Sequence, residues 1–213
     1  MRAVLFDLDG TVTDPGIGIT NSVMYALRKF DIEPPDRKEL YCFIGPPLRE
    51  SFSKYFGLSA SDAEKAVAYY REYYRPTGIF ECELYDGITE AFAALSGAGF
   101  KIALATAKPD VFAEKIAAHF GFDRYLSCIS GAALDGSRDD KAEIISIALD
   151  MLSIKDPASS VMAGDRAYDI DGGKKNGLYT IGALYGYSTR EELSHADALA
   201  ENAYDTARIL LGA

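Results

Sequence analysis

Short runs of apolar residues recur along the chain, and each one ends in a turn signal. The first run covers residues 2–9 and is continuously apolar from Ala3 to Phe6, before two acids and Gly10 follow. Continuous runs of this kind predict strands that are buried on both faces, as in parallel sheets. Four later runs have the same character: residues 101–107, 126–130, 160–165 and 179–184.

Helical patterns lie between these runs, with apolar residues recurring every three or four positions. They cover residues 88–98, 111–120, 141–152 and 170–176. Strands that alternate with helices predict an α/β fold with a Rossmann-like parallel sheet. In such sheets ligands bind outside the carboxyl ends of the strands, so the residues that directly follow each run are candidate site residues.

Residues 15–83 do not continue this alternation of strands and helices, because they contain amphipathic helical segments and no convincing buried strand. We therefore expect a small helical domain inserted after the first strand, with residues 1–14 and 84–213 forming the α/β core. Within the insert, paired tyrosines at positions 69–70 and 73–74 fall at helical spacing. We interpret them as an aromatic packing face rather than as a cofactor site.

The composition excludes several classes of function. With 22 basic and 32 acidic residues the net charge is -10, which disfavours binding to nucleic acid or to an anionic membrane. Two histidines are too few for a histidine-rich metal site, and three scattered cysteines suit neither a disulfide framework nor a zinc site. No apolar run is long enough to span a bilayer and no cleavable signal is evident, so we expect a cytoplasmic protein. An anionic substrate needs local positive charge here, which a bound cation can supply.

The chemically distinctive residues lie at the ends of the predicted strands or in the segments that follow them. Asp7 and Asp9 end the first run, in the sequence DLDGT. Either acid alone is typical of a cap on the turn that follows a strand. Their companions are a hydroxyl, a lysine and two more acids, which follow later strands or turns: Thr106, Lys141, Asp165 and Asp169. Because the carboxyl ends of parallel strands share one edge, we expect all these side chains to lie near a single ligand.

This ordered set resembles the haloacid dehalogenase superfamily of aspartate-nucleophile phosphatases, and the resemblance covers the whole chain. The four motifs of that superfamily are DxDx(T/V), a Ser or Thr that ends a strand, a Lys, and GDxxxD. The matching residues here are, in order, Asp7 with Asp9 and Thr11, Thr106, Lys141, and Asp165 with Asp169. Residues 15–83 correspond to the small helical cap of the family. Residues 105–109 (ATAKP) and 43–48 (FIGPPL) resemble the branch of phosphoglycolate-phosphatase-like and 5'-nucleotidase-like enzymes.

The resemblance implies hydrolysis through an aspartyl-phosphate, with Mg²⁺ as cofactor. Asp7 is then the nucleophile and Asp9 the general acid and base. Thr106 offers its hydroxyl and neighbouring N–H groups to the phosphoryl oxygens, and Lys141 adds a fixed positive charge. The implied metal ligands are oxygens: Asp7, the backbone carbonyl of Asp9, Asp165, and Asp169 either directly or through water.

Each further candidate substrate contact can be interpreted either as a binding residue or as a purely structural one. Thr11 either orients the first loop or merely caps it. Lys108, which follows Ala107, either closes the phosphate pocket or faces water. In the insert, Gly45 and two prolines predict a stiff turn before a helix start, where N–H groups and Arg49 can bind an anion. The alternative for this segment is a structural turn with an exposed arginine.

These residues favour a phosphatase, monomeric or homodimeric, that acts on a small phosphorylated metabolite, phosphoglycolate-like or nucleotide-like. A sugar-phosphate mutase of the same fold, similar to β-phosphoglucomutase, uses the same Asp7 and Asp9 and is the alternative. A dehalogenase needs neither the second aspartate nor the metal-binding acids. A receiver-type signalling domain also phosphorylates an aspartate on a parallel sheet, but it has no helical insert and no acid two residues after the acceptor.

Overall fold

The computed structural model describes residues 2–212, which divide into two compact units. The sheet unit comprises the chain up to Asp14 and from Leu84 onward, and the helical unit is Pro15–Glu83. The sheet unit contains a six-stranded parallel sheet in the order β5-β4-β1-β6-β7-β8. Its strands are β1 Ala3–Phe6, β4 Lys101–Pro109, β5 Leu126–Ala132, β6 Val161–Gly164, β7 Tyr179–Ala183 and β8 Ala198–Ala200.

Strand β1 lies inside the sheet, which explains why its sequence is continuously apolar. It pairs with β4 on one side and β6 on the other, and Phe6 lies opposite Leu104 and Ala163. Every residue of β1 is fully buried, and burial of each large apolar side chain contributes roughly 1.5–3 kcal/mol. The chain therefore leaves β1 at the carboxyl edge of the sheet, directly after Phe6. The predicted α/β fold with a parallel sheet is confirmed.

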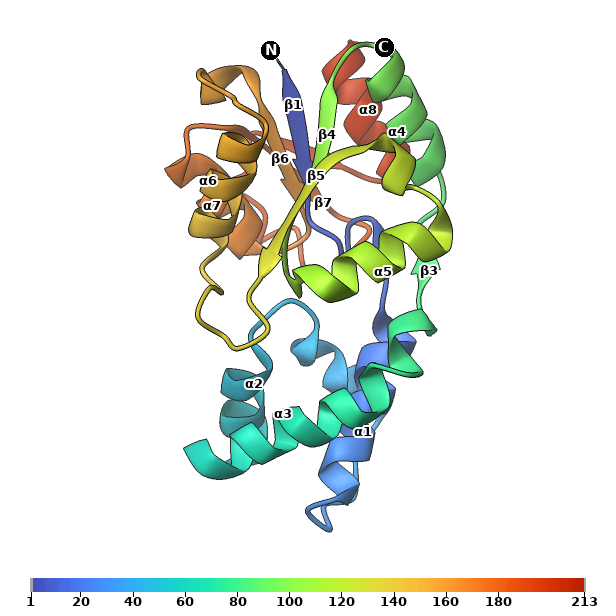
Figure 1. Ribbon diagram of the computed structural model, residues 1–213, viewed down its shortest axis with the longest axis vertical. Helices are drawn as coiled ribbons and strands as arrows, with labels where there is room; N and C mark the ends of the chain where they lie inside the picture. The colour runs from blue at the N-terminus through green and yellow to red at the C-terminus, as the bar shows by residue number, and fades with distance from the viewer. Residues whose placement is uncertain (1, 213) are drawn as a thin grey trace. The chain divides into compact units, whose positions relative to one another are not determined.

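Helices cover both faces of the sheet (Figure 1). One face carries α6 Lys141–Met151 and α7 Ala167–Lys175, and the other carries α4 Ile88–Gly97, α5 Asp110–Phe120 and α8 Ala203–Leu211. At the start of α6, the Asp140 side chain accepts a hydrogen bond from the Glu143 N–H at 2.9 Å, which caps the helix. Ile144 and Ala148 of α6 join the core beneath it. No helix formed by residues 2–212 combines the length and the apolar character needed to cross a bilayer.

The pattern of apolar runs does not predict every strand of the structure. Strand β8 has only three residues, and α8 follows it closely after Asn202. A second, two-stranded sheet pairs β2 Thr13–Asp14 with β3 Glu83–Leu84. Strands this short show no apolar period, so only their backbone pairing reveals them. Strand β4 also continues past its predicted end, to Pro109.

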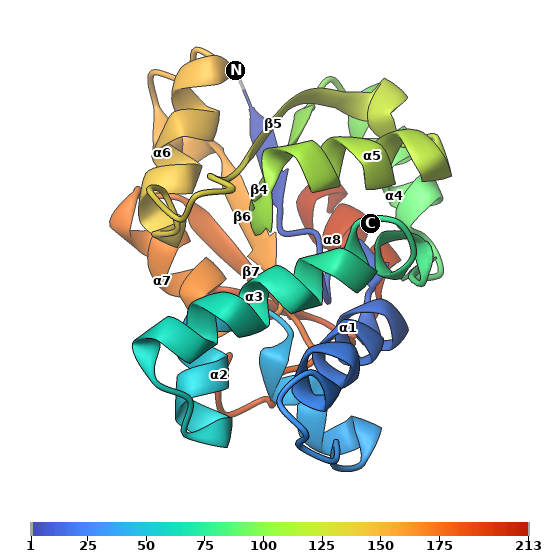
Figure 2. The same ribbon diagram turned by 60° about the horizontal axis from the view of Figure 1, so that its bottom comes forward.

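The helical unit is built around α1 Gly16–Arg28, α2 Leu48–Phe56 and α3 Ala60–Tyr74, with 3₁₀ helices at Arg37–Phe43 and Gly78–Phe80. Helices α1 and α3 pack against each other (Figure 2). Tyr70 and Tyr74 stack with 5.2 Å between their ring centroids, and both are buried. These two tyrosines therefore serve packing, as their helical spacing predicts.

Candidate active site

Asp7 directly follows β1 and lies at the carboxyl edge of the sheet. Its N–H donates to the Ala163 carbonyl at 2.9 Å, which continues the pairing with β6, and the residue is buried. Gly10 then turns the chain with a φ of +84°. A Cβ at Gly10 would lie 2.3 Å from Asp165 Oδ2. Glycine is therefore required for the first loop to pass this close to Asp165.

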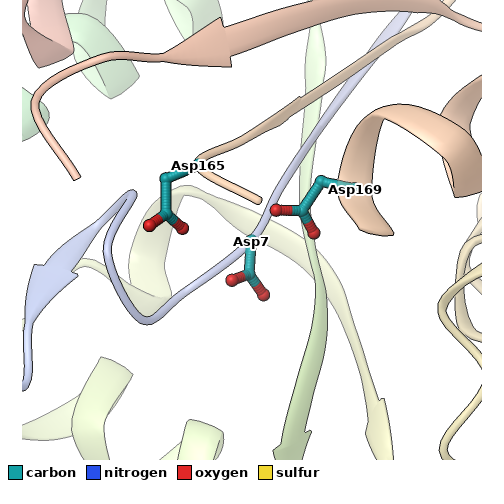
Figure 3. A group of neighbouring side chains, drawn as sticks. All are labelled: Asp7, Asp165 and Asp169. Atoms are coloured by element: carbon teal, nitrogen blue, oxygen red, sulfur yellow. The ribbon is translucent and has the colours of Figure 1, made fainter. Parts of the chain in front are cut away.

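Asp7, Asp165 and Asp169 form a buried acidic cluster (Figure 3). One carboxylate oxygen from each lies within 4.8 Å of the others. Asp165 follows β6, and Asp169 lies in the first turn of α7. A Cβ at Gly164 would lie 2.2 Å from the carboxyl carbon of Asp169. Burial, followed by the charges of Asp169 and Asp7, raises the pKa of Asp165 well above its usual range. Burial likewise raises the pKa of Asp169 to about 6, although Lys141 opposes the shift.

Lys141 is a cation that the protein itself supplies to this cluster. It is the first residue of α6, and its Nζ lies 2.8 Å from Asp7 Oδ1 and 2.7 Å from Asp169 Oδ1. Nζ also donates to the Ala105 carbonyl at 3.0 Å. Burial opposes the charged form of Lys141, but Asp169 and Asp7 outweigh it and raise the pKa of the lysine. One lysine cannot offset three acids, and carboxylate oxygens are the ligands that Mg²⁺ prefers, so the cluster fits this ion.

Asp9 is paired with a different lysine. Its Oδ2 lies 2.8 Å from Lys108 Nζ, and the two side chains are 13% and 4% exposed, respectively. The solvent-facing alternative for Lys108 is therefore wrong. Burial raises the pKa of Asp9, and the opposing effect of Lys108 is smaller. Asp9 Oδ1 is buried and has no hydrogen-bond partner among residues 2–212, which leaves one carboxyl oxygen open for proton transfer.

The two predicted threonines lie at the same edge of the sheet. The Thr11 hydroxyl donates to Asp165 Oδ1 at 3.3 Å, so Thr11 orients a cluster acid. The Thr106 hydroxyl accepts from the Lys108 N–H at 3.2 Å, which shapes the end of β4. Ala107 lies between Thr106 and Lys108 in β4 and is half-buried. Contacts of these residues with a substrate stay a prediction.

A loop after β7 contributes to the site, although no motif points to it. The Tyr187 N–H donates to Asp165 Oδ2 at 2.9 Å, and the Tyr187 hydroxyl donates to Asp14. A Cβ at Gly186 would lie 2.3 Å from the Gly10 carbonyl oxygen. The available signal is a glycine between two tyrosines, directly after a predicted strand.

Arg138 ties the loop before α6 to the start of α5. Its Nε donates to the Gly131 carbonyl at 2.9 Å, and its guanidinium pairs with Asp110 Oδ2 at 2.7 Å. Asp110 also accepts from the Gly131 N–H. These bonds fix the segments that precede Lys141 and follow Lys108. In the sequence Arg138 is only one of several charged residues before Lys141.

Gly45 and Arg49 lie around the start of α2 in the helical unit. Gly45 has a φ of +103°, and Pro47 occupies the N-cap position of the helix. The predicted turn before a helix is therefore present. The Arg49 side chain is 52% exposed and forms an ion pair with Glu64 of α3. A substrate contact for either Gly45 or Arg49 stays a prediction.

The sheet and its carboxyl edge together define a class of protein. It is an α/β protein in which a buried aspartate, two further acids and a lysine converge at the end of an inner strand. Residues 4–183 match the haloacid dehalogenase-like hydrolase family. The chain therefore belongs to this family, and the predicted class of enzyme, a phosphatase-type hydrolase, is confirmed at that level.

Known proteins with similar sequences and structures support the same conclusion. A 5'-nucleotidase of Pseudomonas aeruginosa is 45% identical over 190 residues, which are 89% of this chain and 86% of the relative. The tyrosine-protein kinase PtkA of Mycobacterium tuberculosis is 38% identical over 186 residues, which are 87% of this chain and 63% of PtkA. This chain thus spans less than two thirds of PtkA. The crystal structure of a predicted phosphatase from Clostridium acetobutylicum has a TM-score of 0.94 and 41% identity, and the match covers 100% of this chain and 99% of that chain.

Proposed function

We propose that this chain is a magnesium-dependent phosphatase that hydrolyses a small phosphomonoester through an aspartyl-phosphate at Asp7. The observation that carries the proposal is the position of the Asp7 carboxylate, which lies 2.8 Å from Lys141 Nζ and within 4.8 Å of carboxylate oxygens of Asp165 and Asp169. A carboxylate can attack an anionic phosphoryl group only where positive charge offsets the repulsion. Lys141 supplies part of that charge, and a cation held by the acids supplies the rest.

The acidic cluster fits a magnesium ion. The proposed ligands are oxygens: Asp7, Asp165, Asp169 and the backbone carbonyl of Asp9. The Asp165 carboxylate is oriented by the Thr11 hydroxyl and the Tyr187 N–H, one on each oxygen, as outer hydrogen bonds commonly orient metal ligands. When bound, Mg²⁺ offsets the negative charge of the phosphoryl group and of the acids around it.

The protein's own groups account for two successive displacements at phosphorus. In the first, an Asp7 carboxylate oxygen bonds to phosphorus while the bond to the leaving oxygen breaks, and its electron pair stays on that oxygen. Asp9 gives a proton to the leaving oxygen, so an alcohol departs. In the second, Asp9 takes a proton from water, and the water oxygen bonds to phosphorus. The bond to Asp7 then breaks, which restores the carboxylate and releases inorganic phosphate. Lys141 stabilises the phosphoryl oxygens in both steps.

Among phosphomonoesters, we propose nucleoside monophosphates first and phosphoglycolate second, because a relative with 45% identity is a 5'-nucleotidase. A panel of nucleoside monophosphates, phosphoglycolate and sugar phosphates, assayed for released phosphate with magnesium, tests this order. We expect continuous release, with the highest kcat/KM for a nucleoside monophosphate. Isomerisation of a sugar phosphate that needs a bisphosphate activator supports the mutase alternative. No release from any ester contradicts the proposed function.

Arg49→Ala is expected to lower kcat/KM for the preferred substrate by roughly 10- to 100-fold and to change it little for para-nitrophenyl phosphate. We propose that Arg49 binds the leaving group, and a lost charge-assisted hydrogen bond costs about 1.5–3 kcal/mol. Such a contact lowers the barrier only for substrates that reach it. Steady-state kinetics with both esters measure the difference.

Glu64→Gln is the matched control for Arg49→Ala, because it removes the ion-pair partner of Arg49 and keeps the arginine. We expect it to keep the preference for the natural substrate. Equal losses on both esters for Arg49→Ala would mean that the arginine supports the fold or general phosphate binding instead.

A further inference from the structure

Two buried lysines pair with different acids of the site. Lys141 pairs with Asp7 and Asp169, whereas Lys108 Nζ lies 2.8 Å from Asp9 Oδ2. The Lys108 side chain is only 4% exposed, so protein atoms enclose its ammonium group. Lys141 thus lies on the proposed nucleophile Asp7, whereas Lys108 lies on the proposed general acid Asp9.

The backbone presents Lys108 to Asp9 from a well-defined strand end. Lys108 lies in β4, and its N–H donates to the Thr106 hydroxyl at 3.2 Å. The next residue is Pro109, whose ring fixes its own φ. Asp110 is then held by its ion pair with Arg138 at 2.7 Å. The lysine therefore projects from a segment that is anchored on both sides.

The two carboxyl oxygens of Asp9 have different surroundings. Oδ2 accepts from the Lys108 ammonium group, so a proton on Asp9 is disfavoured at that oxygen. Oδ1 is buried and has no hydrogen-bond partner among residues 2–212. A buried polar atom without a partner is unfavourable, and such an atom in a native protein is often one that a ligand uses.

We propose that Lys108 is a positioning residue that holds Asp9 by Oδ2 and leaves Oδ1 to transfer the proton. Oδ1 then gives its proton to the leaving oxygen in the first displacement and takes one from water in the second. This inference rests on the proposed function, because it assigns a role within the same two displacements. Lys108 acts through Asp9 and makes no contact with the phosphoryl group.

Lys108→Met separates this role from phosphate binding, because methionine keeps the apolar stem and removes the charge. An alkyl phosphate needs its leaving oxygen protonated, whereas para-nitrophenyl phosphate hardly does. We expect kcat/KM for the alkyl phosphate, which reports the first displacement, to fall by about 10- to 100-fold, as a fraction of the contribution of a general acid. We expect kcat/KM for para-nitrophenyl phosphate to fall much less, because its leaving group hardly needs the acid. Lys101→Met is the control, because Lys101 lies in the same strand but donates to the Leu152 carbonyl at 3.0 Å.

The Asp9→Asn background gives a second readout. Once Asp9 has lost its acid function, Lys108→Met should change kcat for para-nitrophenyl phosphate by less than about threefold. Competitive inhibition by inorganic phosphate should also stay within about threefold. In this comparison the loss of Lys108 leaves no buried Asp9 charge without a partner, because the single and the double variant both carry Asn at position 9. A large further loss of kcat, or much weaker inhibition by phosphate, would show that Lys108 binds the phosphoryl group and would overturn the proposal.

A crystal structure of Lys108→Met decides the point without any assay. The proposal requires the Asp9 carboxylate to leave its wild-type position when the ammonium group is gone. An Asp9 side chain that keeps its position would overturn the proposal, whatever the substrate. Wild-type protein that hydrolyses neither the alkyl nor the aryl ester would instead refute the proposed function, so the two failures are distinguishable.

Discussion

Asp7→Asn is expected to lower kcat by at least about a thousandfold on every phosphomonoester, while the protein stays folded. Asparagine has nearly the same size, but its amide cannot form an aspartyl-phosphate. The substitution also removes one of the negative charges beside Asp165, and Lys141 keeps its ion pair with Asp169 at 2.7 Å. Steady-state phosphate release gives kcat, and thermal unfolding followed by circular dichroism reports the fold.

Asp171→Asn is the matched control for this loss. Asp171 lies in α7 like Asp169, but its side chain is 60% exposed and its hydrogen-bond partner is His195. We expect this variant to keep the wild-type kcat. If Asp7→Asn remained as active as wild type, Asp7 could not be the nucleophile.

Removal of divalent metal is expected to abolish activity, and added Mg²⁺ is expected to restore it. The three carboxylates of the cluster lie within 4.8 Å of one another and are only partly neutralised by Lys141. Binding should also stabilise the fold, because at about 100 times Kd a ligand adds about 2.7 kcal/mol. For a protein of this size that corresponds to a rise in Tm of roughly 5–10 °C. Chelation with EDTA, followed by titration with Mg²⁺, measures both effects.

Calcium and Asp165→Asn serve as the controls for the metal. Ca²⁺ takes more oxygen ligands at longer distances than Mg²⁺, so it should bind and stabilise the protein without supporting turnover. Asp165→Asn should lose most of the Mg²⁺-dependent rise in Tm. Full activity of metal-free protein would contradict the magnesium requirement.

The strands that form the site could be predicted because a strand that is buried on both faces has a continuous run of apolar residues. Strand β1 is buried along its whole length, and β6 likewise, so both read as continuous apolar runs. The carboxyl ends of these two runs therefore locate Asp7 and Asp165 at the site edge from the amino-acid pattern alone. Strand β8 is different, because it has only three residues and two of them are only partly buried. Its place next to β7 depends on pairing between segments that are separated in the sequence.

The pairings inside the site could not be predicted in the same way. The sequence alone leaves Lys108 between a phosphate contact and a solvent-exposed position, because the choice depends on how the end of β4 lies against the first loop. The contact of Tyr187 with Asp165 similarly depends on a loop without a recognisable period. The ion pair between Arg166 and Glu192 at 3.2 Å likewise joins segments that are separated in the sequence. Motifs predict which residues gather at the site, and tertiary packing decides which of them touch.

Chemical trapping of the phosphorylated aspartate shows whether Asp7 is the nucleophile. In Asp9→Asn, para-nitrophenyl phosphate should still phosphorylate Asp7, because its leaving group hardly needs an acid. The second displacement lacks its base, so the aspartyl-phosphate should accumulate. Borohydride reduces an aspartyl-phosphate to homoserine, which mass spectrometry detects in the peptide. We predict homoserine at position 7 when substrate and magnesium are both present, and unmodified aspartate when either is absent. Homoserine at another aspartate, or turnover with no modified residue under trapping conditions, would contradict the account.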